Sequence, residues 1–139
     1  MKTYRKMKTY KNKRFGFTVI ELMIVIMIVS ILVALAYPAY IQYVRKAKRG
    51  EAQQLLLNWA INQEIWRSNN TAYTDTLVPS HDDYTFEATG VGAATYTLTA
   101  TAASGNDQEK DVAKGSPPPS CATLSLTQAG TKTPPACWD

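Results

Sequence analysis

The segment FGFTVIELMIVIMIVSILVALAYP, residues 15–38, decides the fold of this chain. From Leu22 to Tyr37 it has sixteen residues, of which only Ser30 is clearly polar. Counted from Phe17, the apolar run has twenty-one residues, and a helix of that length spans roughly 30 Å, the hydrocarbon thickness of a bilayer. A chain of 139 residues can hardly bury such a helix on every side. The run therefore predicts a membrane-spanning helix rather than the core helix of a soluble domain.

Glu21 is the charged residue inside this run. A carboxylate within a membrane segment costs about 2.5–3.5 kcal/mol on the insertion scale. An interaction must offset that cost, which makes Glu21 a candidate functional residue. The alternative is that its carboxylate lies at the level of the lipid headgroups, because Glu21 is only four positions from Phe17.

A basic leader precedes the apolar run. Residues 1–16 contain seven of the fifteen Lys and Arg residues and no acidic residue. Without them the chain keeps eight basic and eleven acidic residues, so its net charge changes from +4 to −3. The basic charge of the whole chain is therefore no argument that the remainder binds nucleic acid. The excess of Lys and Arg before the span predicts that the leader stays in the cytoplasm and that the C-terminal domain lies outside.

Residues 14–21, RFGFTVIE, join this leader to the apolar run. They resemble the class III signal of type IV prepilins and of the related type II secretion pseudopilins. The resemblance implies that a prepilin peptidase cleaves after Gly16, removes residues 1–16, and methylates the new N-terminus at Phe17. It also implies that Glu21 is an assembly residue, which pairs with the amino group of Phe17 in a neighbouring subunit.

A conventional secretory signal is the competing interpretation of the N-terminus. Residues 34–36, Ala-Leu-Ala, superficially fit a small-residue cleavage site. Cleavage there would remove the apolar helix, whereas prepilin cleavage keeps it. The apolar run is longer than a typical signal-peptide core, and a basic amphipathic segment follows it directly. An N-terminus at Tyr37 would contradict the prepilin interpretation.

A helical pattern continues beyond Pro38. Apolar residues recur at spacings close to three and four, which predicts one helix over residues 17–69, roughly 75–80 Å long. Pro38 lacks a backbone donor and predicts a kink near its position. In the pilins that this chain resembles, the first half of such a helix protrudes and the second half packs on a sheet. The outer half has apolar residues expected on the packed face: Leu55, Leu56, Trp59, Ile65 and Trp66.

Two features of this helix have more than one interpretation. Gly50 weakens the helix by about 1 kcal/mol relative to Ala and marks either a soft point or a site of close packing. The basic cluster at residues 45–49 is expected to contact headgroups or solvent. Its alternative partner is an acidic residue of a neighbouring subunit.

Residues 70–139 are predicted to form an antiparallel β-domain. Apolar and polar residues alternate at 84–88, 95–101 and 122–128, which predicts three strands in a meander with the helix on its buried face. A fourth short strand is expected after a turn at 130–135. The segment 104–120 is expected to be a mobile exposed loop, unless it has a function. The fold class is α+β, and the resemblance implies the type IV pilin fold.

Cys121 and Cys137 are the two cysteines of the chain. An even count in an exported segment predicts one disulfide, which contributes roughly 3 kcal/mol by the chain-entropy model. Two free buried thiols are the alternative. The pattern over the last forty-five residues or so resembles minor pilins of the PilE type, and this resemblance implies that the bridge closes the D-region of that family.

No catalytic or metal-binding pattern is evident in the sequence. His81, the single histidine, adjoins Asp82 and Asp83, but no nucleophile lies in a recognisable motif. Asp75, Asp82 and Asp83 lack the ligand spacing of a calcium loop, and one cysteine pair excludes a four-cysteine zinc site. We therefore expect no enzymatic activity, no cofactor and no metal site.

The resemblance implies a structural subunit of a type IV pilus, most similar to a minor pilin. Before assembly such a subunit lies in the inner membrane with a periplasmic C-terminal domain, and afterwards in the extracellular fibre. Its implied partners are other pilin subunits, the prepilin peptidase, the inner-membrane assembly machinery and the lipid bilayer. The fibres of the family serve adhesion, twitching motility or DNA uptake.

Two alternatives remain, a type II secretion pseudopilin and a DNA-binding minor pilin. The second needs a basic surface. After Gly50 the chain has ten acidic residues and only four basic ones, Arg67, Lys110, Lys114 and Lys132.

Overall fold

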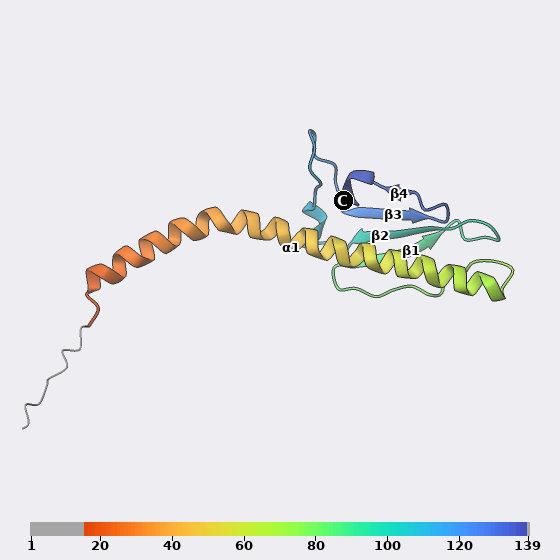
Figure 1. Ribbon diagram of the computed structural model, residues 1–139, viewed down its shortest axis with the longest axis horizontal. Coiled ribbons are helices and arrows are strands. Elements are labelled where there is room, and N and C mark those ends of the chain that lie inside the picture. The colour runs from red at the N-terminus through yellow and green to blue at the C-terminus, as the bar shows by residue number, and fades with distance from the viewer. Residues whose placement is uncertain (1–15, 139) are drawn as a thin grey trace, which may run out of the picture. The chain divides into compact units, whose positions relative to one another are not determined.

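The computed structural model describes residues 16–138 (Figure 1). Residues 1–15 of the predicted leader and Asp139 lie outside the described residues. The chain divides into two compact units at Tyr37 and Pro38. This boundary separates the apolar run from everything that follows it.

A single long helix, α1 (Val19–Asn69), has 51 residues and extends through both units. It begins two residues later than predicted and ends at the predicted residue. Ser30, the polar residue of the apolar run, donates its hydroxyl to the carbonyl oxygens of Ile26 (2.7 Å) and Met27 (2.9 Å). This polar group is thus satisfied within the helix itself. Pro38 lies inside α1, and the kink expected there stays a prediction.

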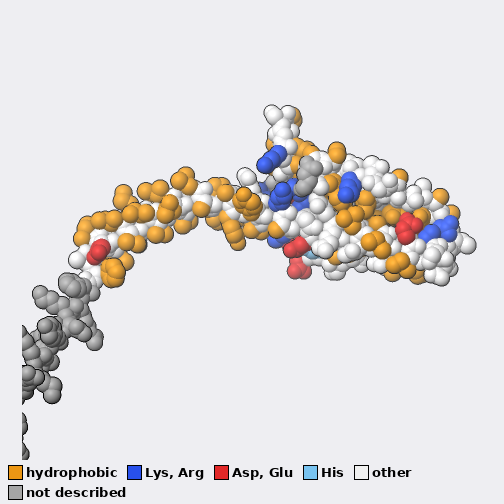
Figure 2. Space-filling view, in the orientation of Figure 1, with side chains coloured by type: hydrophobic (Ala, Val, Ile, Leu, Met, Phe, Trp, Pro, Cys, Tyr) orange, Lys and Arg blue, Asp and Glu red, His pale blue; other side chains and the backbone are white. Residues whose placement is uncertain are grey.

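The first unit is an apolar helix without a covering layer. All of residues 16–40 are exposed, and hydrophobic side chains occupy most of the visible surface of this segment in Figure 2. Among the described residues, α1 is the helix that is long and apolar enough to cross a membrane. By its length and composition, this unit agrees with the predicted span.

The second unit contains a four-stranded antiparallel sheet in the order β1-β2-β3-β4 (Figure 1). The strands are β1 (Tyr84–Thr89), β2 (Thr97–Ala102), β3 (Thr123–Thr127) and β4 (Lys132–Thr133). The first three confirm the predicted meander. The fourth lies inside the segment expected to be a turn, because the chain reverses earlier, at Gly130, whose φ of 78° favours glycine.

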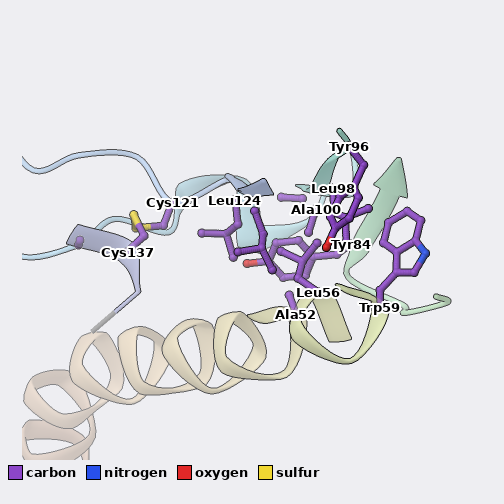
Figure 3. Packing of buried hydrophobic residues seen from close by; sticks show 13 residues of the cluster. Ala52, Leu56, Trp59, Tyr84, Tyr96, Leu98, Ala100, Cys121, Leu124 and Cys137 are labelled. Carbon is purple, nitrogen blue, oxygen red and sulfur yellow. A yellow bond between two sulfur atoms is a disulfide. The ribbon is translucent and has the colours of Figure 1, made fainter. Parts of the chain in front are cut away.

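The core lies between β1–β3 and the second half of α1 (Figure 3). Alternate residues of β2 and β3 point to the helix, as the two-residue period predicts: Leu98, Ala100, Leu124 and Leu126 are buried. From α1, Ala52, Leu56 and Trp59 complete the same cluster. Burying each large apolar side chain contributes about 1.5–3 kcal/mol.

The apolar face of α1 is shorter than predicted. Ile65 and Trp66 are 59% and 38% exposed, so their assignment to the core is wrong. The buried positions follow the helical period to Gln63, which is polar. Its amide donates to the carbonyl oxygen of Thr74 (2.6 Å) and accepts from the backbone N–H of Thr74 (3.0 Å). A connecting segment, not the sheet, therefore covers this end of the helix.

Candidate functional site

The bond predicted to be cleaved precedes the helix. Gly16, Phe17 and Thr18 have no regular secondary structure, and all three are exposed. Phe17 is the most exposed large apolar side chain of the described residues, at 89%. An exposed, non-helical peptide bond is open to a protease. Cleavage after Gly16 and methylation of Phe17 stay predictions.

Thr18 and Glu21 form a capping box at the start of α1. The backbone N–H of Glu21 donates to Thr18 Oγ1 (3.2 Å), and the backbone N–H of Thr18 donates to Glu21 Oε2 (3.3 Å). Two donors that the helix cannot pair internally are thereby satisfied. The pattern Thr-x-x-Glu at residues 18–21 is the sequence signal for this cap, which the sequence-based prediction lacked. Glu21 therefore has a local role in the single chain, and its assembly role stays a prediction.

The predicted disulfide is present between Cys121 and Cys137. The two Cα atoms lie 5.7 Å apart, and both residues are fully buried. The bridge joins the chain just before β3 to the short helix η2 (Pro135–Cys137). Gln53 Nε2 donates to the carbonyl oxygen of Cys137 (2.6 Å), so the bridge is also tied to α1.

Three of the four basic residues of the cluster at 45–49 are paired within the chain, so the expected contact with headgroups or solvent remains open only for Lys46. Both carboxylate oxygens of Asp107 accept from the Arg45 guanidinium at 2.8 Å. Arg49 Nη1 lies 3.0 Å from Asp111 Oδ2, and both residues are buried, at 6% and 4% exposure. Lys48 Nζ lies 2.7 Å from an oxygen of Asp83. Lys46 is the exposed basic residue of the cluster.

Part of the segment 104–120 is packed against α1 through the buried side chains of Gln108 and Asp111, whereas residues 114–118 are exposed as expected. It contains the short helix η1 (Asp107–Lys110). The buried Gln108 donates through Nε2 to the carbonyl oxygen of Arg45 (3.0 Å) and to Tyr84 Oη (2.8 Å). Sequence reasoning missed Gln108 and the two aspartates. A signal was available, because Arg45 and Arg49 have the same spacing of four as Asp107 and Asp111.

These contacts set the pKa values of the groups around α1. The hydrogen bond from Arg45 holds the pKa of Asp107 below its usual range, and that from Lys48 does the same to Asp83. Burial raises the pKa of the Asp111 carboxyl against the opposing effect of Arg49. Burial also raises the pKa of Tyr84 to about 12. Hydrogen-bonded cations thus lower the pKa values of Asp107 and Asp83, whereas burial raises those of Asp111 and Tyr84.

A groove of about 710 Å³ lies between α1 at residues 39–49 and the segment 110–114. Asp111 is its acidic lining residue. The groove has five of the eight basic residues that follow Tyr37, namely Arg45, Lys46, Arg49, Lys110 and Lys114. The rest of residues 38–139 has three basic and nine acidic residues. Positive charge in the second unit is therefore concentrated in this groove, which we call the basic groove.

Two further basic residues lie against aromatic rings. Lys132 Nζ is 5.1 Å from the centroid of Trp138, and the Arg67 guanidinium carbon is 6.0 Å from that of Tyr73. Cation–aromatic pairs at such distances are attractive. They also combine the two side-chain types found on single-stranded nucleic-acid surfaces.

His81 contacts Glu51 rather than forming an acid–base pair with a neighbouring aspartate. His81 Nε2 lies 3.1 Å from Glu51 Oε2, while Nδ1 accepts the backbone N–H of Asp83 (3.0 Å). Within residues 16–138, no group of three or more His, Cys, Asp and Glu residues is arranged to hold a metal ion. This includes the aspartates considered for calcium, Asp75, Asp82 and Asp83.

Two protein families match the chain, one for each unit. Residues 38–125, more than half of the chain, match the family described as type IV minor pilin ComP, DNA uptake sequence receptor. Residues 11–37 match the prokaryotic N-terminal methylation motif. The second range contains Gly16, Phe17 and Glu21.

Curated relatives are similar over part of their length. The chain is 45% identical over 64 residues to the fimbrial protein of Neisseria meningitidis serogroup A, covering 41% of this chain and 38% of that protein. It is 42% identical over 64 residues to the fimbrial protein of Moraxella nonliquefaciens, covering 46% of this chain and 42% of that protein. The chain thus matches less than half the length of each.

A solved structure, a type IV pilin from Shewanella oneidensis, has a similar fold. The TM-score is 0.52 at 24% sequence identity, and the match covers 68% of this chain and 98% of that one. This likeness confirms the predicted fold class, a long N-terminal helix whose outer half packs on a small antiparallel sheet.

Proposed function

Because this chain belongs to the ComP family of type IV minor pilins, we propose that it is a structural subunit of a type IV pilus that assembles through its N-terminal helix. One observation carries this proposal: the apolar residues 22–37 are all exposed in the single chain. So large an apolar surface needs either lipid or other apolar helices around it. A bilayer supplies the first before assembly, and the helices of neighbouring pilins supply the second in the fibre.

Processing of the N-terminus precedes assembly in this proposal. The prepilin peptidase cleaves after Gly16 and methylates Phe17, and the match to the N-terminal methylation motif supports both steps. The chain then lies in the inner membrane with residues 38–139 in the periplasm, until the assembly machinery transfers it to the fibre. The Cys121–Cys137 disulfide supports an oxidising compartment for this domain. The family is a structural one, and we propose that the chain has no enzymatic activity of its own.

Glu21 selects the position of a subunit in the fibre. An unpaired carboxylate is costly in an apolar environment, so a pairing that exists in one axial position favours that position. Cleavage after Gly16 leaves an amino group on Phe17, and the capping box already holds the Glu21 carboxylate near Thr18, the residue that follows Phe17. We propose that the partner is the Phe17 amino group of a neighbouring subunit.

Mass spectrometry of fibres sheared from cells tests the proposal. The expected result is a chain that begins at methylated Phe17 and is a small fraction of the fibre, as for a minor pilin. For Glu21→Gln, we expect the amount in fibres to fall by about tenfold or more, equivalent to at least 1.4 kcal/mol of lost pairing. Glu109→Gln, an exposed change outside the apolar segment, is the matched control.

One outcome would contradict the pilus function, and another would contradict only the role of Glu21. A chain that is cleaved after Gly16 yet stays in the envelope would instead support the pseudopilin alternative. Normal incorporation of the Glu21→Gln subunit would refute the pairing, although not the fibre itself.

DNA uptake is the second candidate function, and the description of the matching family favours it. The contacts of Lys132 with Trp138 and of Arg67 with Tyr73 supply cations beside aromatic rings. A domain with a net acidic charge can bind DNA only through such local patches. We propose that the chain processed after Gly16, in detergent, binds duplex DNA with an affinity that falls steeply with salt.

The salt dependence tests this second function. Lys132→Gln should reduce the magnitude of the slope of log K, the DNA association constant, against log salt by about 1. This is the change expected for the loss of one phosphate contact. Lys132→Arg keeps the charge and is the control. A chain that is not retained on DNA at low salt would have no receptor function, and the pilus function would be unaffected.

A further inference from the structure

The basic groove has a positive charge that its own contacts do not neutralise. Arg45 and Arg49 are matched by Asp107 and Asp111. Lys46 and Lys114 have no ion-pair partner among residues 16–138, and Lys110 lies 3.7 Å from an Asp107 oxygen that Arg45 already occupies. The groove therefore presents about three positive charges to whatever enters it.

The walls of the basic groove are held in place by buried contacts. The Arg49–Asp111 pair and the amide of Gln108 fix the segment 107–111 to α1. The backbone N–H of Cys121 donates to the carbonyl oxygen of Asp111 (2.8 Å), which ties the same wall to the disulfide. A preorganised wall lowers the cost of ordering a ligand.

The size and lining of the basic groove fit a small amphiphilic anion. Its volume of about 710 Å³ is that of a small-molecule site, which typically ranges from about 300 to 1,000 Å³. The exposed side chains of Tyr43 and Val112 add apolar surface beside the lysines. A phospholipid headgroup with its glycerol offers both a phosphate and apolar atoms. A DNA duplex, with a major groove alone about 12 Å wide, would meet only the rim.

The position of the basic groove along the chain also favours a lipid. Lys46 follows Tyr37, the last residue of the apolar run, by nine residues, or roughly 14 Å of helix path. The interfacial layer on each side of a bilayer is about 5–8 Å thick, and a lysine stem can extend back toward it. Tyr40 and Tyr43, both highly exposed, lie between the two and are typical of membrane interfaces.

We propose that the basic groove binds the phosphate of an anionic phospholipid while the chain is anchored in the membrane. Lys46, Lys110 and Lys114 contact the phosphate, and each contributes on the order of a fivefold change in association. This site rests on the proposed membrane anchoring and adds a second membrane contact to it. Transfer into a fibre then requires release of the lipid.

The test uses the full chain in nanodiscs of phosphatidylcholine alone or mixed with phosphatidylglycerol. A fluorophore on Ser116→Cys, an exposed position close to the groove in sequence, reports quenching by a trace lipid with a nitroxide headgroup. We expect strong quenching only with phosphatidylglycerol, and its loss in the triple variant Lys46→Gln/Lys110→Gln/Lys114→Gln. A fluorophore on Ser68→Cys, at the far end of α1, should remain unquenched in both discs.

Matched variants separate the groove from general charge. Lys46→Gln should reduce the quenching, whereas Lys132→Gln removes the same charge outside the groove and should not. Within the described residues, the ion-pair contact that the triple variant removes is the one of Lys110 with Asp107, at 3.7 Å on the exposed surface. An unchanged thermal midpoint of the triple variant would show that the domain stays folded.

Three outcomes would overturn the proposal. Equal quenching in the two discs, or quenching that survives the triple variant, would show that no anionic lipid binds. Release by inorganic phosphate at constant ionic strength would assign the groove to free anions. Release by duplex DNA, with DNA affinity lost in the triple variant, would assign it to nucleic acid.

The lipid site and the pilus function fail in different measurements. Lysine-dependent quenching in a chain that never enters fibres would contradict only the pilus function. Normal incorporation into fibres without lysine-dependent quenching would contradict only the lipid site.

Discussion

The two halves of α1 are parts of one helix with opposite surroundings. Residues 19–37 are exposed on every side, although they are the most apolar in the chain. The second half buries one face, and two of its five buried residues, Arg49 and Gln63, are polar. Burial in this chain therefore depends on what covers a residue and not on how apolar it is. The first half has to find its cover outside its own chain.

Breaking the buried ion pair of Arg49 and Asp111 is expected to cause the largest change in stability, and it tests this contrast. Arg49→Met leaves Asp111 buried without its cation, and we expect the free energy of unfolding to fall by about 3–5 kcal/mol. Chemical unfolding of the full chain in detergent, followed by near-ultraviolet circular dichroism, measures this. Lys46→Met, an exposed change three residues earlier, should stay within about 0.5 kcal/mol of the native value.

A double variant sharpens the same test. Arg49→Met/Asp111→Leu removes both charges and should recover most of the lost stability. If the double variant is no more stable than Arg49→Met alone, the unpaired carboxylate is not the cause of the loss.

The same substitution, Leu to Ala, at a buried and at an exposed position of α1 isolates the effect of burial on stability. Leu56→Ala empties a fully buried site between α1 and the sheet, and should cost about 2–5 kcal/mol. Leu32→Ala removes the same atoms from an exposed site and should leave the unfolding of the second unit unchanged. Equal losses in the same unfolding experiment would mean that the first half has packing partners within the chain.

Tyr84 tests the polar contacts beneath the sheet. Tyr84→Phe removes the hydroxyl that accepts from Gln108, at an expected cost of about 1 kcal/mol. The pKa of Tyr84 is raised from 10.0 to about 12 by burial, so its contribution to stability is complete below pH 10 and is lost as the pH rises toward 12. Between pH 9 and pH 12 the free energy of unfolding should therefore decrease less steeply with pH for Tyr84→Phe than for the native chain.

Substitution of Gly50 is expected to cause the smallest change in stability, and it is the one substitution expected to be stabilising. A Cβ atom built on Gly50 has no atom of the described residues within 4 Å apart from the helix itself, so Gly50 is not a site of close packing within residues 16–138. Gly50→Ala should raise the stability of the second unit by about 0.5–1 kcal/mol, because alanine has less conformational freedom to lose. A lower thermal midpoint for Gly50→Ala would indicate that the chain needs flexibility here.

Most elements of this fold could be predicted because their signals are local. The apolar run, the helical period and the alternation in β1–β3 are each visible in neighbouring residues of the sequence. They predict the helix and the meander. The exposure of Ile65 and Trp66 could not be read in this way, because an apolar residue does not tell what covers it. The same holds for β4, since two residues are too few for a period.

The candidate sites divide in the same manner. Gly16, Phe17 and Glu21 could be predicted as site residues because a short contiguous motif contains them, and their roles stay predictions. The basic groove was not found, because its lysines and arginines come from segments more than sixty residues apart in the chain. The one sequence signal for the contact between these segments is that Arg45 and Arg49 have the same spacing of four residues as Asp107 and Asp111.

The two arginine–aspartate pairs also define a mechanical route through the second unit. Each pair joins residues 62 positions apart in the chain, and Asp111 is bonded through its carbonyl oxygen to Cys121. A pull on α1 ahead of Arg45 would therefore pass directly into the segment 107–111 and the disulfide. The pair of Lys48 and Asp83, at 2.7 Å, would carry part of the same load to the start of β1. Polar crosslinks near the start of the second unit would therefore take up tension before the apolar contacts around Leu56 and Trp59.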